Sequence, residues 1–233
     1  MKMRYVLLGL VLMAPLWVMA EEQEGAPGRT IEDLFLSQDI ELQILRSQAL
    51  GTDPEMKRLA LRSIRAMVEQ GVASDGVFVV LEALASEGVS RQVRSQGAIV
   101  NNFPLIRREA TELLGQVGGE RAKNTLLRVL RDDPEVVVLA EAAYALGSIG
   151  LNQNNEVSDY LVHTLLRENA RSTPDNNLAY SIVISLERLS EANGGLANPE
   201  VINALIETAS SPYIRTVRMR AVDAIVNMRD HGR

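Results

Sequence analysis

The sequence contains no cysteine and only two histidines, His163 and His231. Without cysteine the chain forms no disulfide, no thiolate nucleophile, no iron–sulfur cluster and no cysteine-based zinc site. The two histidines stand far apart in the sequence, which argues against a histidine-based metal centre. We therefore expect no metal site in this chain.

Aromatic side chains are also scarce, at 4% of the chain, and the single tryptophan is Trp17. Basic residues are not in excess, because 24 Lys and Arg stand against 30 Asp and Glu, for a net charge of -6. A general binder of nucleic acid or of anionic membranes needs the opposite balance. Hydrophobic residues reach 46%, enough for a globular core. We expect a folded protein that does not bind nucleic acid.

Common enzyme motifs are missing as well. No GxGxxG follows a strand pattern and no GxxxxGK[ST] occurs, so dinucleotide and P-loop sites are not expected. Ser148 lies in LGSIG, but Leu146 stands where a nucleophile elbow needs glycine, so we interpret Ser148 as structural. The pair Asp132–Asp133 could bind Ca²⁺ or act in acid–base chemistry, whereas acids before a helix usually cap its free N–H groups. We expect capping, no catalytic residue and no cofactor.

The N-terminus has the pattern of a secretory signal. Lys2 and Arg4 precede an almost wholly apolar run over 5–19, and small residues end at Ala20, where signal peptidase would cleave. The run is shorter than the roughly 20 residues that span a bilayer. We predict a signal peptide over 1–20, a disordered acidic linker over 21–30, and a soluble product exported to the periplasm or cell envelope. A retained signal anchor is the alternative, and the missing cysteine excludes a lipoprotein.

A repeat runs through the rest of the chain. Each copy has an apolar residue, which we call the anchor, a small or apolar residue four positions later and an apolar residue eight positions later. These offsets lie on one face of a helix. The five copies are Met56, Ala60, Ile64; Ile106, Ala110, Leu114; Val138, Ala142, Leu146; Leu178, Ile182, Leu186; and Val217, Ala221, Ile225.

The repeated unit is predicted to be a helical hairpin. A proline precedes each anchor helix, where its missing N–H costs nothing, and glycines stand where such a helix should stop. A second apolar-periodic run follows four of the five anchor helices, at 75–87, 120–131, 156–169 and 199–209. The prolines are Pro54, Pro104, Pro134, Pro174 and Pro212, and the glycines are Gly71, Gly118, Gly119, Gly150, Gly194 and Gly195.

The blocks PLIRREATELLGQVGG and VVLAEAAYALGSIG resemble HEAT repeats of the bacterial type also found in phycobilisome lyases. The match is specific at 104–150, and the period extends it over 54–228. With the signal segment, NNFPLIRREA, LGSIGLNQNNE and SEANGG are also similar to secreted HEAT-repeat proteins of spirochaetes. The resemblance implies an all-α fold, an α-solenoid of about five hairpins in one domain over 31–233. Residues 31–49 would form an N-terminal capping helix.

The chain departs from the repeat pattern at Leu139, at Ala179 and in an inserted stretch, 88–103. The family places a basic residue one position after the anchor, and here it survives as Lys57, Arg107 and Arg218. Similar residues in the family commonly pair with acids of adjacent repeats. The resemblance therefore implies a structural ladder of ion pairs, and a phosphate-binding row is the alternative.

In HEAT-type stacks the second helices line the concave surface. Aligning these helices by their core positions places two rows of polar residues toward solvent, one helical turn apart. We predict that this face binds a protein partner, and an ordinary solvated face is the alternative, because the rows have mixed charge and no aromatic anchor. The rows are Asn124, Asp159, Asn203 and Arg128, His163, Glu207.

The fifth repeat stops after its first helix at about Met228, which leaves a C-terminal edge. That edge is either capped by Arg220, Asp223 and Asn227 or used for self-association. Together these patterns predict an exported, non-enzymatic scaffold that binds another protein of the periplasm or envelope. An enzyme or chromophore lyase with the same repeat, and a self-assembling structural protein, are the alternatives.

Overall fold

The computed structural model describes residues 31–90, 92–196 and 198–231. The chain divides into two units, Met1–Ser37 and Gln38–Arg233. Of the first unit only the beginning of one helix is described, and the account below concerns the second unit. The predicted signal peptide, 1–20, and the linker, 21–30, lie outside the described residues.

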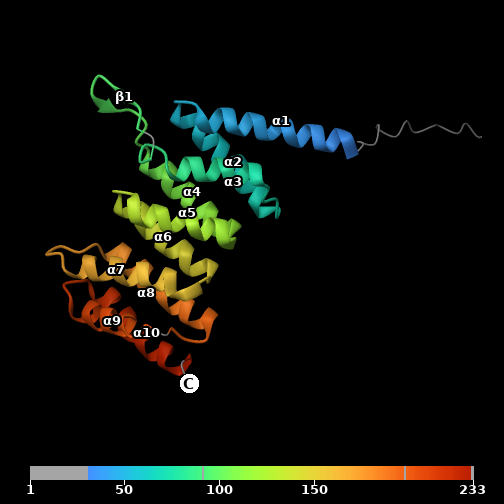
Figure 1. The fold of residues 1–233 in the computed structure, drawn as a ribbon. Helices are drawn as coiled ribbons and strands as arrows, with labels where there is room; N and C mark the ends of the chain where they lie inside the picture. The colour runs from blue at the N-terminus through green and yellow to red at the C-terminus, as the bar shows by residue number, and fades with distance from the viewer. Residues whose placement is uncertain (1–30, 91, 197, 232–233) are drawn as a thin grey trace, which may run out of the picture. The chain divides into compact units, whose positions relative to one another are not determined.

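The described residues form α-helices almost throughout, with one 3-10 turn and one short hairpin (Figure 1). In chain order the elements are α1 (Ile31–Leu50), α2 (Pro54–Glu69), α3 (Asp75–Ala85), β1 (Arg94–Ser95), β2 (Ala98–Ile99), α4 (Pro104–Val117), α5 (Gly119–Asp132), α6 (Val136–Ile149), η1 (Gln153–Asn155), α7 (Glu156–Asn169), α8 (Asn176–Asn193), α9 (Glu200–Ser210) and α10 (Arg215–His231).

These helices form the predicted stack of hairpins, α2–α3, α4–α5, α6–α7 and α8–α9, closed by α10. The first helices pack on one another in chain order, α4 on α6, α6 on α8 and α8 on α10. Each hairpin buries its apolar stripe against its neighbours, and the buried residues form one continuous core. The all-α solenoid predicted from the repeat is confirmed.

Local sequence signals explain where the helices begin and end. Pro54 and Pro104 occupy the first turn of α2 and α4. The Asp175 carboxylate accepts the N–H groups of Asn177 and Leu178 at the start of α8. Gly150 ends α6 in the left-handed conformation, which glycine adopts without strain. The turns predicted at proline and glycine are therefore the turns of the structure.

The core follows the repeat, with one correction at its start. The anchors Ile106, Val138, Leu178 and Val217 are buried. Met56, taken as the first anchor, is exposed instead. The other two positions of this copy, Ala60 and Ile64, are buried as predicted, and Lys57 is buried one position after the anchor, as Arg107 is in α4. The first copy therefore differs from the pattern only at its anchor.

The first helices approach one another closely through glycine. A side chain at Gly115 would bring its Cβ to 2.7 Å from the Cβ of Ala145. A side chain at Gly147 would bring its Cβ to 2.5 Å from the Cα of Ser185, whose hydroxyl donates to the Ala143 carbonyl at 2.7 Å. Because only glycine leaves this room, the contacts from α4 to α6 and from α6 to α8 depend on it. We call these two contacts the glycine seam.

The inserted stretch 88–103 forms a small antiparallel hairpin, β1 with β2. Gln96 and Gly97 both have positive φ, as a tight two-residue hairpin turn requires. Most of its residues are exposed, and the hairpin projects away from α3 and α4, at the upper left of Figure 1. The periodicity identified this stretch only as an interruption, because its strands are two residues long.

The C-terminal edge differs from its predicted polar cap. Arg220 and Asn227 face inward and bind the carboxylate of Glu187 on α8. Asp223 is exposed, but the outward side of α10 also exposes Met219, Val222 and Val226. The side chains chosen as a cap are thus partly used within the stack, and an apolar stripe takes the outer position.

Candidate protein-binding face

The four second helices, α3, α5, α7 and α9, present a common exposed side that we call the second-helix face. The six predicted residues all lie on it and all are exposed: Asn124, Arg128, Asp159, His163, Asn203 and Glu207. The predicted register also holds, because the residues aligned as core are buried: Ala122, Leu126, Val157, Leu161, Val201 and Leu205. All six side chains are therefore exposed on the second helices, and their role in binding stays a prediction.

Arg128 is held by a charge cluster that joins α5 to α3. Its guanidinium forms an ion pair with Glu82 and donates to the Thr125 hydroxyl at 3.1 Å. Arg121 reaches the same carboxylate at 3.6 Å and stacks over the Phe78 ring, 4.1 Å from its centroid. Arg121 also pairs with Asp75 at 3.3 Å, so two arginines stand against two acids, and stacking on Phe78 helps to hold the cluster in place.

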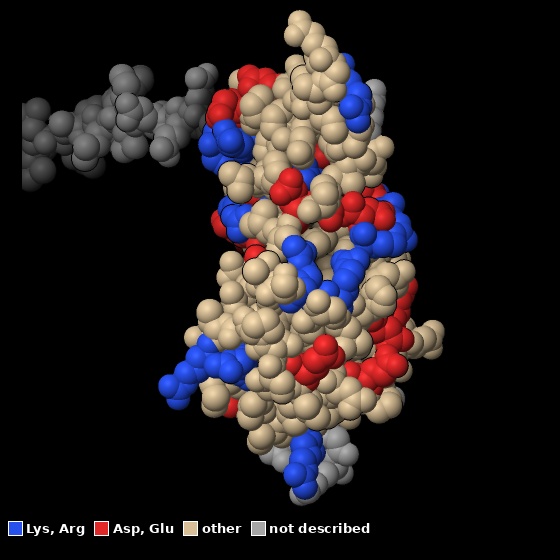
Figure 2. Space-filling model, turned by 90° about the vertical axis from the view of Figure 1, so that its left-hand side faces the viewer, with Lys and Arg blue, Asp and Glu red and all other residues tan. Residues whose placement is uncertain are grey.

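A small pocket opens beside this cluster, between the C-terminal ends of α3 and α5. It holds about 80 Å³, whereas pockets for small molecules usually measure about 300–1,000 Å³. The space suits a single side chain of a partner rather than a cofactor. Figure 2 shows a view of the stack in which basic side chains gather beside a hollow at mid-height. The pocket is lined by Glu82, Ala85, Ser86, Val89, Ser90, Thr125, Arg128, Val129, Asp132 and Asp133.

The C-terminal part of the face is less charged. Asp159 accepts a hydrogen bond from the Asn198 side chain at 2.8 Å. Two exposed residues of these helices lie outside the predicted rows, Tyr160 on α7 and Ile206 on α9. Tyr160 follows Asp159 in the chain, and Ile206 precedes Glu207. A prediction that also counted the residue next to each solvent-facing position would have included both. Tyr160 supplies the aromatic residue that the predicted rows lacked.

A second polar cluster lies on the first helices. Arg65 of α2 forms ion pairs with Glu109 at 3.3 Å and with Glu112 at 2.8 Å, both on α4. Arg108 of α4 approaches Glu141 of α6 at 3.4 Å. The hydrogen bond from Arg65 lowers the pKa of the Glu112 carboxyl. Burial, together with the nearby Glu112 charge, raises the pKa of the Glu141 carboxyl.

This cluster borders an open hollow of about 470 Å³ between α4 and α6. Tyr144 and Ser148 also line it, and Arg188 stacks on the Tyr144 ring at 4.3 Å. The Ser148 hydroxyl donates to the Tyr144 carbonyl and accepts from Arg188, so it lacks an activating base. The hollow is the part of the described surface that most resembles an enzyme cleft.

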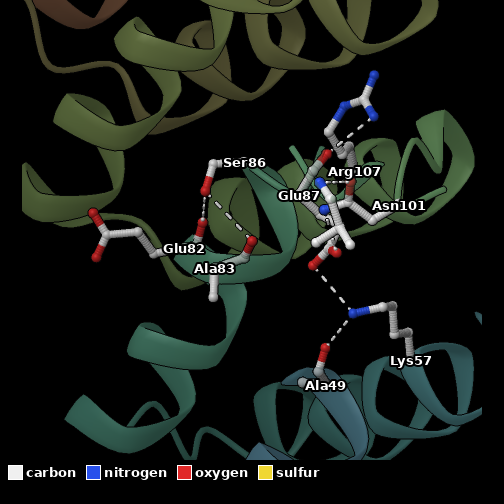
Figure 3. Close-up of polar contacts among 9 residues, drawn as sticks. Ala49, Lys57, Glu82, Ala83, Ser86, Glu87, Asn101 and Arg107 are labelled. Atoms are coloured by element: carbon white, nitrogen blue, oxygen red, sulfur yellow. Dashed lines mark hydrogen bonds and ion pairs between the residues drawn. The ribbon is translucent and has the colours of Figure 1, made fainter. Parts of the chain in front are cut away.

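A buried polar network joins the first two repeats at the base of the inserted hairpin (Figure 3). Lys57 is 1% exposed and donates to the Ala49 carbonyl at 2.6 Å and to Glu87 at 3.1 Å. Asn101 donates to the same Glu87 carboxylate at 3.1 Å and accepts the Val93 N–H at 2.8 Å. The network therefore fixes both ends of the insertion to α2 and α3.

Arg107 continues this network into the next repeat. Its side chain is fully buried and contacts Asp133 through two hydrogen bonds of 2.6 and 3.2 Å. It also donates to the Glu87 carbonyl at 3.2 Å and to the Asn102 side chain at 2.7 Å. Asp133 in turn accepts the N–H of Glu135, the residue before α6, but no side chain caps the first turn of α6, so the expected capping role is not observed.

Arg218, the third basic repeat residue, does not continue the ladder. Its side chain is exposed, and no ion pair joins it to another described residue. The Arg220–Glu187 pair is the contact that α10 makes instead. Lys57 and Arg107 are buried and hydrogen-bonded within the protein. Among the described residues, these repeat positions therefore do not form an exposed row of basic side chains that could bind phosphate.

Within the described ranges, no group of three or more His, Asp or Glu side chains gathers as a metal site. No helix in the same part of the chain is long and apolar enough to cross a bilayer. His163 stands exposed on α7.

Comparison with known proteins identifies the repeat. Residues 92–187 match the family model described as HEAT repeats. The fold is similar to a solved structure of the complex of CpcE and CpcF of phycocyanin lyase from Nostoc sp. PCC7120. That match has a TM-score of 0.58 and 16% sequence identity, and covers 95% of this chain and 71% of the other. No curated protein matches the sequence.

Proposed function

Since the chain is built of HEAT repeats, we propose that it is a non-enzymatic scaffold that binds another protein through its second-helix face. The observation that carries the proposal is the exposed, mixed-charge surface that continues over consecutive repeats. It contains an arginine cluster at α5 and an exposed tyrosine at α7. Arginine and tyrosine are the residue types that most often dominate protein interfaces.

The proposal is tested by crosslinking and affinity capture from an envelope extract. The test variant combines Arg128→Glu, His163→Glu and Glu207→Arg, all exposed on the second-helix face. The control variant combines Arg62→Glu and Glu191→Arg, which are exposed on α2 and α8. A stoichiometric protein bound by the parent and the control, but lost by the test variant, supports the proposal. Equal capture by all three assigns binding to another surface.

Export is part of the same proposal. It is supported by the basic start, the apolar run over 5–19 and the small residues before Glu21. Cell fractionation with mass measurement of the purified protein tests it. A periplasmic product that begins at Glu21 is the expected result. A membrane-bound product of full mass would instead indicate a retained signal anchor.

A lyase-like activity is a second candidate, favoured by the hollow between α4 and α6 and by the raised pKa of Glu141 beside it. The similar fold belongs to phycocyanin lyase subunits. Incubation of the chain with phycocyanin and its chromophore tests this candidate, with Glu141→Gln as the variant. Chromophore attachment or removal that the variant lacks would replace the scaffold proposal.

A further inference from the structure

Both ends of the helical stack expose apolar side chains where solenoids usually carry polar caps. On α10, Met219, Val222 and Val226 are 48%, 41% and 55% exposed. Their spacing of three and four residues places them in one stripe, on the side of α10 opposite the buried Ala221 and Met228. This stripe faces away from α8 and α9.

The position of Val226 indicates what the stripe is suited to contact. In the preceding first helices, the residue nine positions after the anchor touches the next first helix. Val226 is the equivalent residue in α10, which is the last helix that the structure describes. The stripe is therefore the surface on which another helix of the stack would pack. The preceding residues and their contacts are Arg65 to Glu112, Gly115 to Ala145, Gly147 to Ser185 and Glu187 to Arg220.

The opposite end offers a helix of matching character. α1 buries Leu45 and Ala49 and exposes Ile40, Ile44 and Leu50. Its sequence, IEDLFLSQDIELQILRSQAL, has four acids and one arginine. The sequence of α10, RTVRMRAVDAIVNMRDH, has four arginines and two acids, and Arg220 pairs with Glu187. The two end helices thus combine apolar stripes with opposite charge.

We propose that α10 of one copy packs on α1 of a second copy, so that the protein associates head to tail. The opposite net charges of the α1 and α10 sequences favour this pairing. Pairing of α10 with itself, antiparallel about Val222, would set Arg215 against Arg229. Because the contact joins two different surfaces, each added copy leaves one free α1 and one free α10. The chain of copies is therefore open-ended.

Sedimentation velocity of the purified chain over a wide concentration range tests the proposal. The average mass of the parent rises with concentration beyond that of a dimer. Val226→Glu blocks the α10 end and Ile44→Lys blocks the α1 end, so each variant alone stays monomeric. An equimolar mixture of the two variants forms one dimer and stops there, because each supplies the end that the other lacks.

Val137→Glu, at an exposed apolar position of first helix α6, is the matched control and leaves the association of the parent unchanged. Circular dichroism confirms that each variant is folded. A parent that stays monomeric, a parent that stops at a dimer, or a variant mixture that stays monomeric would each overturn the head-to-tail contact. These variants leave the second-helix face intact, so failure here is separate from failure of the proposed partner binding.

Discussion

The interior of the stack and its two outer interfaces are built differently at one position of the repeat, nine residues after the anchor. In α4 and α6 this position is Gly115 or Gly147, and the helices meet at backbone distance. In α2 it is Arg65, bound to two glutamates of α4, and in α8 it is Glu187, bound to Arg220 of α10. The same place in the fold is filled by close packing in the middle and by charge toward the ends.

The difference separates two ways of joining repeats. Close packing gains dispersion contacts and tolerates no added atom. An ion pair spans a wider gap, and its strength depends on how far water is excluded. The HEAT-repeat match, 92–187, covers the glycine-seam helices and stops at Glu187. The part of the chain most similar to the family is therefore the close-packed part.

Gly147→Ala should have the largest effect on this comparison. The added Cβ would lie 2.5 Å from the Cα of Ser185, so α6 and α8 must move apart. We expect the free energy of unfolding to fall by about 2–3 kcal/mol, although alanine favours the helix. Urea unfolding measures this change. The neighbouring exposed Ser148→Ala is the control and should change it by less than about 0.5 kcal/mol. Equal stability of both variants would show that the seam is not close-packed.

Glu187→Ala should cost less, about 1–2 kcal/mol of unfolding free energy, because Arg220 is 25% exposed and keeps part of its hydration. The variant also removes the acceptor of the Asn227 amide. A double-mutant cycle with Arg220→Ala, followed by urea unfolding, should give a coupling energy of about 1 kcal/mol. Glu191→Ala, exposed on the same helix, is the control. Additive effects of Glu187→Ala and Arg220→Ala would contradict a specific pair.

Arg65→Ala should have a smaller effect, no more than about 1 kcal/mol, since Arg65 and its partners Glu109 and Glu112 are each roughly a third exposed. Thermal unfolding at low and at high salt measures it. The loss should shrink as salt screens the pair. Arg62→Ala, exposed on the same helix, provides the reference. A loss that does not change with salt would indicate packing by the arginine stem instead.

The smallest effect concerns pH. The pKa of the Glu112 carboxyl is lower in the folded than in the unfolded chain. Its ionised form therefore stabilises the fold at a pH above the pKa in the unfolded chain, and this stability is lost as the pH falls through the pKa in the folded chain. The raised pKa of Glu141 has the opposite sign, so the fold loses stability as pH rises through that window. The stability of the Glu141→Gln variant should therefore increase relative to that of the parent as the pH rises above about 4, where a free glutamate ionises. Chemical unfolding at several pH values checks this; a pH-independent difference would contradict it.

The repeat predicted most of the fold because helix periodicity, prolines and glycines are local signals. The hairpin partners, the second-helix register and the exposure of Arg128 and Glu207 all follow from it. What it could not supply depends on contacts between distant residues. Lys57 is buried because it bonds to Ala49 of α1, and Arg220 bonds to Glu187 of α8. Neither partner can be identified from spacing alone.

The base of the inserted hairpin has a consequence for how this chain can vary. Glu87, Asn101 and Arg107 bind one another and hold the two ends of the insertion together before its exposed residues begin. Segments anchored in this way tolerate changes of sequence and length with little effect on the scaffold beneath them. Residues 92–100 are therefore an exchangeable module. Related chains could vary it independently, and an engineer could replace it with a recognition loop while leaving the helices unchanged.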